Sequence, residues 1–247
     1  MRKRYAPLGW PRRDPRHYRF PIPNVVWTCK LKPIEFVVFS YLCYHYTHGQ
    51  DGIPAVDVVA ESVHLTTGTA KKYLNTLVNR GLVSAKWEIT PRLQCTDGEK
   101  FFTLPNEVFL MKFSPSAFMV YAYLLLIEDR RSHTCHPSYN TIASATGLSR
   151  NTVMKSICDL LEAELITMEH SSYFDKRGLK WNGNNLYTIL PVGTAMDRIN
   201  QRQFRQLELD IERRRVRNRQ EDYDRRRPRT AQDGGRKEKR GTKRKAG

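Results

Sequence analysis

The stretch His136–Ile166, HPSYNTIASATGLSRNTVMKSICDLLEAELI, contains two short helical patterns separated by a tight break. The break is Gly147-Leu148-Ser149, in which glycine suits a left-handed turn and the leucine a core position. Ser149 is a good N-cap for the second helix. The apolar residues of that helix recur at spacings of three and four, which indicates one buried face. Two short helices joined this tightly predict a helix-turn-helix, whose second helix enters the major groove of DNA.

A similar pattern occurs earlier in the chain, so the sequence contains an internal repeat. IPNVVW (Ile22–Trp27) matches LPNEVF (Leu104–Phe109) at an offset of 82 residues, and LKPIEFVVFSYL matches FSPSAFMVYAYL at the same offset. At an offset of 83 the similarity continues as far as Leu82-Val83 and Leu165-Ile166. Self-similarity on this scale indicates two copies of one small domain.

The sequence pattern of each copy predicts three helices. The first opens on a proline, which suits the first helical turn, and covers Pro33–Tyr46 in one copy and Pro115–Glu128 in the other. A shorter second helix is expected over Ala55–Val63 and Ser138–Thr146. Thr66 and Ser149 would cap the third helix.

A β-hairpin, or wing, is expected after the third helix. In copy one, alternation over Val83–Ile89 predicts a strand. In copy two, NNLYTIL predicts a strand that follows the glycine-punctuated loop YFDKRGLKWNGN. Helix, helix, turn, helix and hairpin together describe a winged helix-turn-helix.

The predicted fold is therefore mainly α with small β-hairpin wings (α+β). It comprises two tandem winged helix-turn-helix domains, a basic C-terminal helix and a disordered tail. The expected boundaries are a basic N-terminal arm at 1–19, domain 1 at 20–100, domain 2 at 101–194, a basic amphipathic helix at 195–227 and a disordered basic tail at 228–247.

The formal charge of +17 indicates a polyanionic partner. Most of it lies at the two ends, because residues 1–19 carry +6 and residues 197–247 carry +10. Beyond Pro228 the tail has almost nothing to bury, which predicts disorder. Such a tail would add affinity for phosphates of any sequence, or would simply keep the protein in solution.

The segment before the tail predicts a helix with a narrow apolar stripe and an acid-before-base pair, Asp210 and Arg214. Such a helix would dock on the body of the protein or pair with a second chain, so the oligomeric state stays open. The stripe consists of Met196, Ile199, Gln203, Leu207 and Ile211.

The compartment is expected to be the cytoplasm; the family resemblance described below implies that it is bacterial, with the protein in association with the nucleoid or a plasmid. Five scattered cysteines without a C-x-x-C pair indicate reduced thiols. The charged start, MRKRYAPLGWPRR, lacks the apolar segment of a secretory signal. The longest apolar stretches are too short to span a bilayer, so no membrane partner is expected.

HPSYNTIASATGLSRNTV resembles the helix-turn-helix segment of winged-helix proteins from bacterial plasmids, phages and conjugative elements. Their pattern is PS-x-x-x-IA-x-x-x-GLS-R-x-TV, followed by I-x-x-L-x-x-x-x-LI, and residues from Pro137 to Ile166 match it. The tandem arrangement over 20–190 is similar to plasmid replication initiators built from two winged helices. Copy one departs from the pattern, since HLTTGTAKKY lacks the glycine and the arginine and places Gly68 inside the third helix.

This resemblance and the residue chemistry predict DNA contacts in copy two. Arg150 can pair with guanine and Asn151 with adenine, whereas Lys155 suits a phosphate. The alternative is a solvated helix start, where any polar residue would serve. The remaining candidates lie at the N-termini of the two helices, where exposed N–H groups favour phosphate: Ser138, Tyr139, Ser149 and Thr152.

Two further sets of candidates are less distinctive. Lys176, Arg177 and Lys180 in the second wing predict contact with an adjacent groove or with the DNA backbone, although solubility alone would favour a charged hairpin tip. In copy one the lysine pair suits backbone contact, and a surface helix in an architectural copy is the alternative. That set is Thr67, Thr69, Lys71 and Lys72.

The sequence predicts no enzyme, no metal and no cofactor. His45 with His48, and the His133–His136 segment, lack the further ligands that a closed zinc site requires. The phosphate-binding motif G-x-x-x-x-G-K-[ST] does not occur. Nor does the His-apolar-His metal pair of tyrosine nucleases that nick origins.

We therefore expect a sequence-specific double-stranded DNA-binding protein that initiates or regulates the replication of a plasmid, phage or conjugative element. A transcriptional regulator is the alternative in the same class, weakened by the lack of a visible sensor domain. In a different class, one winged helix would be an interaction module that recruits replication proteins. The unusual third helix of copy one keeps that alternative open.

Overall fold

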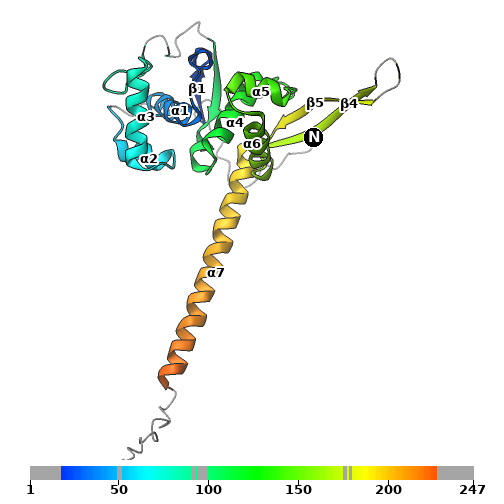
Figure 1. The fold of residues 1–247 in the computed structure, drawn as a ribbon. Coiled ribbons are helices and arrows are strands. Elements are labelled where there is room, and N and C mark those ends of the chain that lie inside the picture. Colours follow the sequence, from blue (N-terminus) through cyan, green and yellow to red (C-terminus); the bar gives the residue numbers. More distant parts are fainter. Residues whose placement is uncertain are drawn as a thin grey trace, which may run out of the picture. The chain divides into compact units, whose positions relative to one another are not determined.

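The structure is a computed structural model that describes residues 18–48, 52–90, 93, 100–174, 177 and 180–226 (Figure 1). It divides into two compact units, residues 1–198 and residues 199–247. The fold is mainly helical with small antiparallel sheets, as the sequence predicts.

The first copy has the predicted succession of three helices, preceded by a strand and a short 3-10 helix. Its elements are β1 (Arg19–Pro23), η2 (Asn24–Cys29), α1 (Pro33–Thr47), α2 (Val56–Ser62) and α3 (Thr67–Asn79).

The second copy repeats this order and adds a three-stranded sheet. Its elements are β2 (Phe101–Pro105), η4 (Asn106–Leu110), α4 (Pro115–Ile127), β3 (Thr134–Cys135), α5 (Tyr139–Thr146), α6 (Arg150–Glu162), β4 (Ile166–Phe174) and β5 (Lys180–Ile189). All six predicted helices are present, and the bounds predicted for the first and second helix of each copy differ by at most one residue from those observed.

The first wing differs from its prediction. Val83 and Ile89 form one antiparallel bridge, and the described residues between them form a turn rather than a strand. The Ser84 hydroxyl accepts hydrogen bonds from the N–H groups of Lys86 and Glu88, and Trp87 has a φ of 58°. The hydroxyl thus offers the backbone a local alternative to a ladder, which outweighs the alternating pattern.

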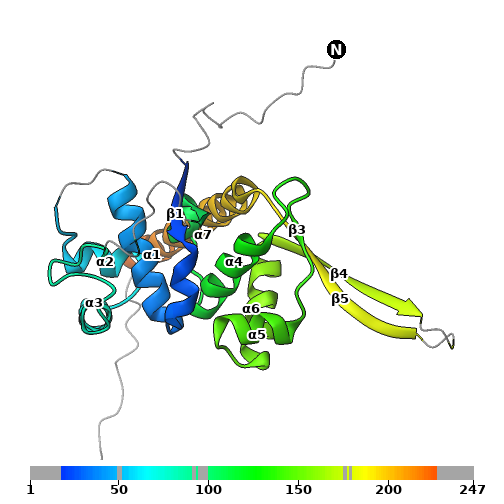
Figure 2. The ribbon, with the colours of Figure 1, turned by 90° about the horizontal axis from the view of Figure 1, so that it is seen from above.

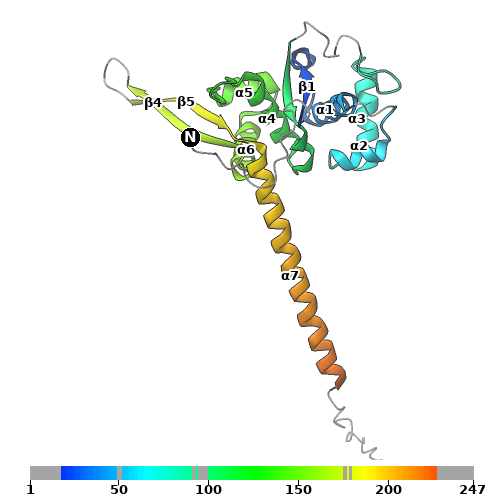
Figure 3. The same ribbon diagram turned by 180° about the vertical axis from the view of Figure 1, so that it is seen from behind.

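The second wing is longer than predicted. β4 pairs with β5 from Ile166↔Ile189 to Phe174↔Lys180, so much of the expected loop YFDKRGLKWNGN is strand. β3 pairs with the other edge of β5, which gives the strand order β3-β5-β4. The wing extends away from the helices of copy two, as Figures 1 and 3 show.

The two copies share one core. β1 pairs with β2, and α1 packs against α4, so each element contacts its counterpart in the other copy. Phe20 and Ile22 in β1, and Phe102 and Leu104 in β2, are buried. The sequence does not predict this two-stranded sheet. RFPIP has prolines at two of its five positions, which strands tolerate only where no ladder hydrogen bond is needed.

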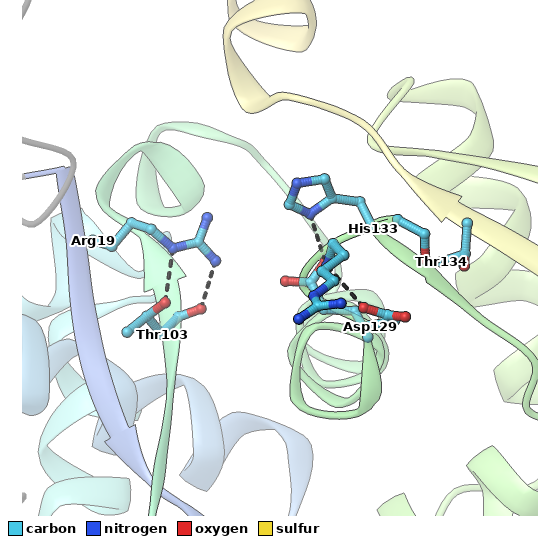
Figure 4. Close-up of polar contacts among 8 residues, drawn as sticks. Arg19, Thr103, Asp129, His133 and Thr134 are labelled. Carbon is cyan, nitrogen blue, oxygen red and sulfur yellow. Dashed lines mark hydrogen bonds and ion pairs between the residues drawn. The ribbon is translucent and has the colours of Figure 1, made fainter.

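Figure 4 shows a polar contact across this sheet, from Arg19 of β1 to Thr103 of β2. The Arg19 guanidinium donates to the hydroxyl and to the carbonyl oxygen of Thr103, each at 2.8 Å. The same figure shows the turn before β3, where Nδ1 of the His133 ring lies 3.4 Å from the Glu128 carboxylate.

The predicted C-terminal helix is α7 (Val192–Arg226). Within the first unit, Ala195 is buried and Arg198 forms an ion pair with Glu164. Within the second unit, Asp210 pairs with Arg213 at 3.7 Å rather than with the predicted Arg214. Its exposed apolar residues include Leu207 and Ile211 of the predicted stripe. The predicted tail at 228–247 and most of the arm at 1–19 lie outside the described residues.

Candidate nucleic-acid interface

The turn between α5 and α6 has the geometry that the sequence indicates. Gly147 is left-handed with a φ of 71°, and its N–H donates to the Ala143 carbonyl at 2.9 Å. The Ser149 side chain accepts from the Thr152 N–H at 3.1 Å, so it caps α6. Ser138 caps α5 in the same way, through the Thr141 N–H at 3.0 Å. These bonds satisfy one donor at each helix N-terminus and leave other N–H groups of the first turn for a ligand.

One face of α6 is buried and the opposite face is exposed. Val153, Ile157 and Leu160 pack inward. The exposed positions recur at intervals of three and four residues and therefore form one continuous surface. We call this surface the α6 face; it consists of Arg150, Asn151, Met154, Lys155, Cys158 and, at the end of the helix, Glu162.

The sequence candidates on α6 thus divide into two groups. Arg150, Asn151 and Lys155 lie on the exposed α6 face. Ser149 and Thr152 bind each other through their hydroxyl groups at 2.8 Å and serve as the cap. Sequence reasoning missed Met154, whose 41% exposure is high for an apolar side chain. Its position off the apolar stripe could have identified it.

The Tyr139 side chain is directed toward the wing. Its hydroxyl donates to the Met168 sulfur of β4 at 3.6 Å, so this candidate links α5 to the wing. Nearby, the Asn185 amide donates to the Tyr187 hydroxyl at 3.0 Å and its oxygen lies 3.0 Å from Nδ1 of His170. Burial raises the pKa of Tyr187 above its usual range, so this hydroxyl stays protonated. The Tyr139 bond thus joins α5 to the wing, and the Asn185–His170 contact joins β5 to β4.

The predicted basic residues of the wing are only partly described. Arg177 is exposed, and Lys180 begins β5. Lys176 lies outside the described residues, as does the side chain of Lys180. The structure therefore does not bring the wing candidates and the α6 face into one defined surface.

The equivalent face of α3 carries different chemistry. We call it the α3 face; its exposed positions are Thr67, Gly68, Lys71, Lys72, Asn75 and Asn79, which match the α6 face one for one at an offset of 83. The Lys72 Nζ lies 5.8 Å from the centroid of the Tyr73 ring. Thr69 is not on this face, because its N–H and hydroxyl bind the capping Thr66.

The first helix-turn-helix also differs at its turn. Ala55 is at the N-cap of α2 and makes no side-chain cap. His64 occupies the position of Gly147 and is left-handed with a φ of 55°. The ring donates from Nε2 to the Phe109 carbonyl of copy two at 3.0 Å. Copy one thus uses this position to contact copy two.

The histidines that the sequence analysis considered make other contacts. Nε2 of His45 lies 3.1 Å from the Gly52 carbonyl oxygen, and Nδ1 of His133 lies 3.4 Å from the Glu128 carboxylate. His48 binds the Tyr44 carbonyl and the Asn106 amide. In the part of the chain that the structure describes, no three His, Cys, Asp or Glu side chains are grouped as metal ligands. No described helix is long and apolar enough to cross a membrane.

Comparisons with known proteins agree with this geometry. Residues 113–166, which contain α4, α5 and α6 and end at the first residue of β4, match the family model of a helix-turn-helix domain. No curated protein matches the sequence.

Two solved structures are weakly similar. A possible transcriptional regulator from Methanosarcina mazei Go1 has 17% identity over 41% of this chain and 78% of its own, with a TM-score of 0.30. ScpB from Mycobacterium tuberculosis has 14% identity over 68% of this chain and 97% of its own, with a TM-score of 0.21. Neither similarity carries a functional conclusion. Residues 113–166 are a helix-turn-helix domain, and this domain supports DNA binding by the protein.

Proposed function

We propose that this protein binds double-stranded DNA sequence-specifically and that α6 is its reader helix. The observation that carries the proposal is the α6 face, where Arg150, Asn151 and Lys155 are exposed on a helix capped by Ser149. Arg and Asn make bidentate contacts with guanine and adenine, and an exposed methionine suits the thymine methyl group. The opposite face of α6 is held by the core, so the reader helix is rigid.

The supporting contacts belong to α5 and the wing. The free N–H groups at the start of α5 suit a phosphate. We assign phosphate contacts to Lys155, Arg177 and Lys180, and also to Lys176. The α3 face, with Lys71 and Lys72, suits the DNA backbone rather than base edges.

The biological role that we propose is initiation or regulation of replication on a bacterial mobile element. It is supported by the GLSRNT turn and by the tandem arrangement of two helix-turn-helix copies. A transcriptional regulator would use the same interface. Mapping the bound sites separates the two roles, because an initiator binds short repeats at an origin and a regulator binds promoters. Promoter sites alone would contradict the replication role.

Arg150→Ala tests the reader helix. We expect the affinity for the cognate site to fall by about 1–3 kcal/mol and the affinity for random DNA to change little. Arg213→Ala on α7 is the control, because it also removes one exposed arginine. Binding titrations on both DNAs give the result. Equal losses on cognate and random DNA would reduce Arg150 to a phosphate contact.

A further inference from the structure

The strand pairing between the two copies is symmetric. In the antiparallel ladder of β1 and β2, Pro21 lies opposite Thr103, and these residues are equivalent at the offset of 82. On either side, Arg19 pairs with Pro105 and Pro23 pairs with Phe101. At the offset of 82, Phe101 is the equivalent of Arg19 and Pro105 is the equivalent of Pro23, so exchanging the two copies turns one pair into the other. An antiparallel pair in which a residue faces its own equivalent has a local two-fold axis at that point. The axis therefore passes between Pro21 and Thr103.

The aromatic core has the same symmetry. Phe36 of α1 contacts its own equivalent, Phe118 of α4, with ring centroids 6.0 Å apart. The contact of Trp27 with Tyr123 is T-shaped at 5.6 Å, and its exchanged counterpart, Phe109 with Tyr41, is T-shaped at 5.5 Å. Self-contacts and exchanged contacts occur only in isologous interfaces. A repeat related by translation would instead bring non-equivalent residues together.

The helices follow this arrangement. Figure 1 views the pair of copies with α1 and α4 side by side at the centre, α3 outside α1 and α6 outside α4. In the same view α2 lies below α3 whereas α5 lies above α6, as rotation by half a turn requires. Figure 2 also places α3 and α6 on opposite flanks of the α1–α4 pair. Within one chain, the two copies are thus arranged as the subunits of a two-fold dimer.

Symmetry of this kind determines the orientation of the DNA sites. Duplex DNA has two-fold axes perpendicular to its length, and two-fold related readers meet half-sites that are inverted relative to each other. The α6 face carries Arg150, Asn151 and Met154, where the α3 face carries Thr67, Gly68 and Lys71. In the proposed function, the α6 residues read base edges, whereas the α3 residues suit phosphates. The two half-sites therefore differ in how strictly their bases are read.

Resting on the proposed function, we infer that one chain binds as a pseudo-dimer to an imperfect inverted repeat. In this arrangement α6 reads a strictly defined half-site, and α3 contacts an inverted, loosely defined half-site about one helical turn away. A dimer of chains is not needed for such a site.

Transplanting the α6 face onto α3 tests the inference. The variant Thr67→Arg/Gly68→Asn/Lys71→Met makes the first four reader positions the same in both copies, since Lys72 already matches Lys155. All three positions are exposed, and the space around Gly68 is open. The unaltered chain and the variant each select sites from a pool of random DNA duplexes, and the selected DNA is sequenced.

We expect the unaltered chain to select one strictly defined half-site and the variant to select two copies of it in inverted orientation. Two copies in direct orientation, or one half-site only, would overturn the inference while leaving DNA binding intact. Failure of the unaltered chain to enrich any sequence would overturn the proposed function itself.

A second measurement keeps the unaltered reader residues. Cys158 on α6 is exposed, and the equivalent position on α3 is Asn75. An iron chelate attached to Cys158, or to the thiol of the Asn75→Cys/Cys158→Ser chain, cleaves nearby DNA. Cys158→Ser alone measures cleavage from the other cysteines. Cleavage patterns that mirror each other about the site centre are expected. A pattern repeated by translation, or no cleavage from position 75, would contradict the two-fold arrangement.

Discussion

Two pairs of equivalent residues adopt left-handed backbone in both copies, although their side chains differ. His64 and Gly147 have φ of 55° and 71°, and Gly81 and Glu164 have φ of 65° and 53°. Each non-glycine residue makes a compensating contact, His64 with the Phe109 carbonyl and Glu164 with Arg198. The turn geometry thus sets the backbone conformation, and a specific contact offsets the strain of a side chain there.

Gly147→Ala measures this strain directly. No atom lies within 4 Å of the added Cβ, so only the left-handed backbone opposes the substitution. We expect the free energy of unfolding to fall by about 1 kcal/mol. Gly68→Ala is the matched control, because it also adds one methyl group in open space but on ordinary helical backbone. It should leave stability unchanged or slightly increased. Urea unfolding of the two variants measures both free energies. Equal losses of stability in Gly147→Ala and Gly68→Ala would contradict the explanation by left-handed backbone strain.

At the scale of the element, the ends of the first and third helices are joined differently in the two copies. In copy one Arg80, after α3, forms an ion pair with the buried Glu35 of α1 and also binds the Cys29 carbonyl. In copy two the equivalent positions are Ala117 and Ala163. The same helix packing is therefore compatible with an ion pair or with two small apolar side chains.

Arg80→Ala should destabilise the protein by about 1–3 kcal/mol, because it leaves a buried carboxylate without its partner. The double variant Glu35→Ala/Arg80→Ala reproduces the pair found in copy two and should recover part of this loss. Denaturant unfolding of the two variants and of the Glu35→Ala single variant completes a double-mutant cycle. A double variant that is as unstable as the sum of both single variants would show that the two residues act independently.

At the scale of the whole molecule, the shared aromatic core makes the two copies of residues 18–198 one folding unit. Phe36 and Phe118 are both nearly fully buried, and each lies against the other. Removing copy one would expose the rings of copy two that now pack against it. The two copies are therefore not independent domains joined by a linker.

Phe36→Ala and Phe118→Ala should each reduce the free energy of unfolding by about 3–5 kcal/mol, by similar amounts in either copy. Hydrogen exchange should show that the amides of α1 and of β5 lose protection together in both variants. Phe204→Ala on α7, which removes a ring that is 68% exposed, is the control and should change stability by less than about 0.5 kcal/mol. Loss of protection confined to the substituted copy would show that the copies unfold separately.

The positive charge of the C-terminal tail also acts at the scale of the whole molecule, because it affects the affinity of the protein for any DNA. Residues 228–247 contain eight Lys or Arg and two acids. We propose that this tail adds affinity without sequence preference. Deleting it should flatten the dependence of log affinity on log salt concentration by several units, since each neutralised phosphate contributes about 0.9 to the slope. Titrations across a salt series on cognate and random DNA should show similar losses. A fall in their ratio would mean that the tail contributes to specificity.

The sequence by itself determined the features that depend on neighbouring residues. The caps at Thr66 and Ser149, the prolines that open α1 and α4, and the apolar periods of α3 and α6 all act over a few positions. The exposure of Arg150, Asn151 and Lys155 on α6 agrees with the same periods, whereas Met154 was missed. Comparison of the two halves also showed the repeat, because equivalent residues keep their order along the chain.

Only the tertiary structure decided how the two copies meet. The offset of 82 residues is the same for a translated repeat and for a two-fold repeat, so it cannot distinguish them. The distinction depends on β1 pairing with β2 and on Phe36 meeting Phe118, contacts between segments about eighty residues apart. The first wing, by contrast, depends on local contacts: hydrogen bonds from Lys86 and Glu88 to the Ser84 hydroxyl compete with a ladder, and the alternating pattern does not indicate them. Local sequence specifies the elements, whereas pairing across the chain specifies the symmetry with which they face DNA.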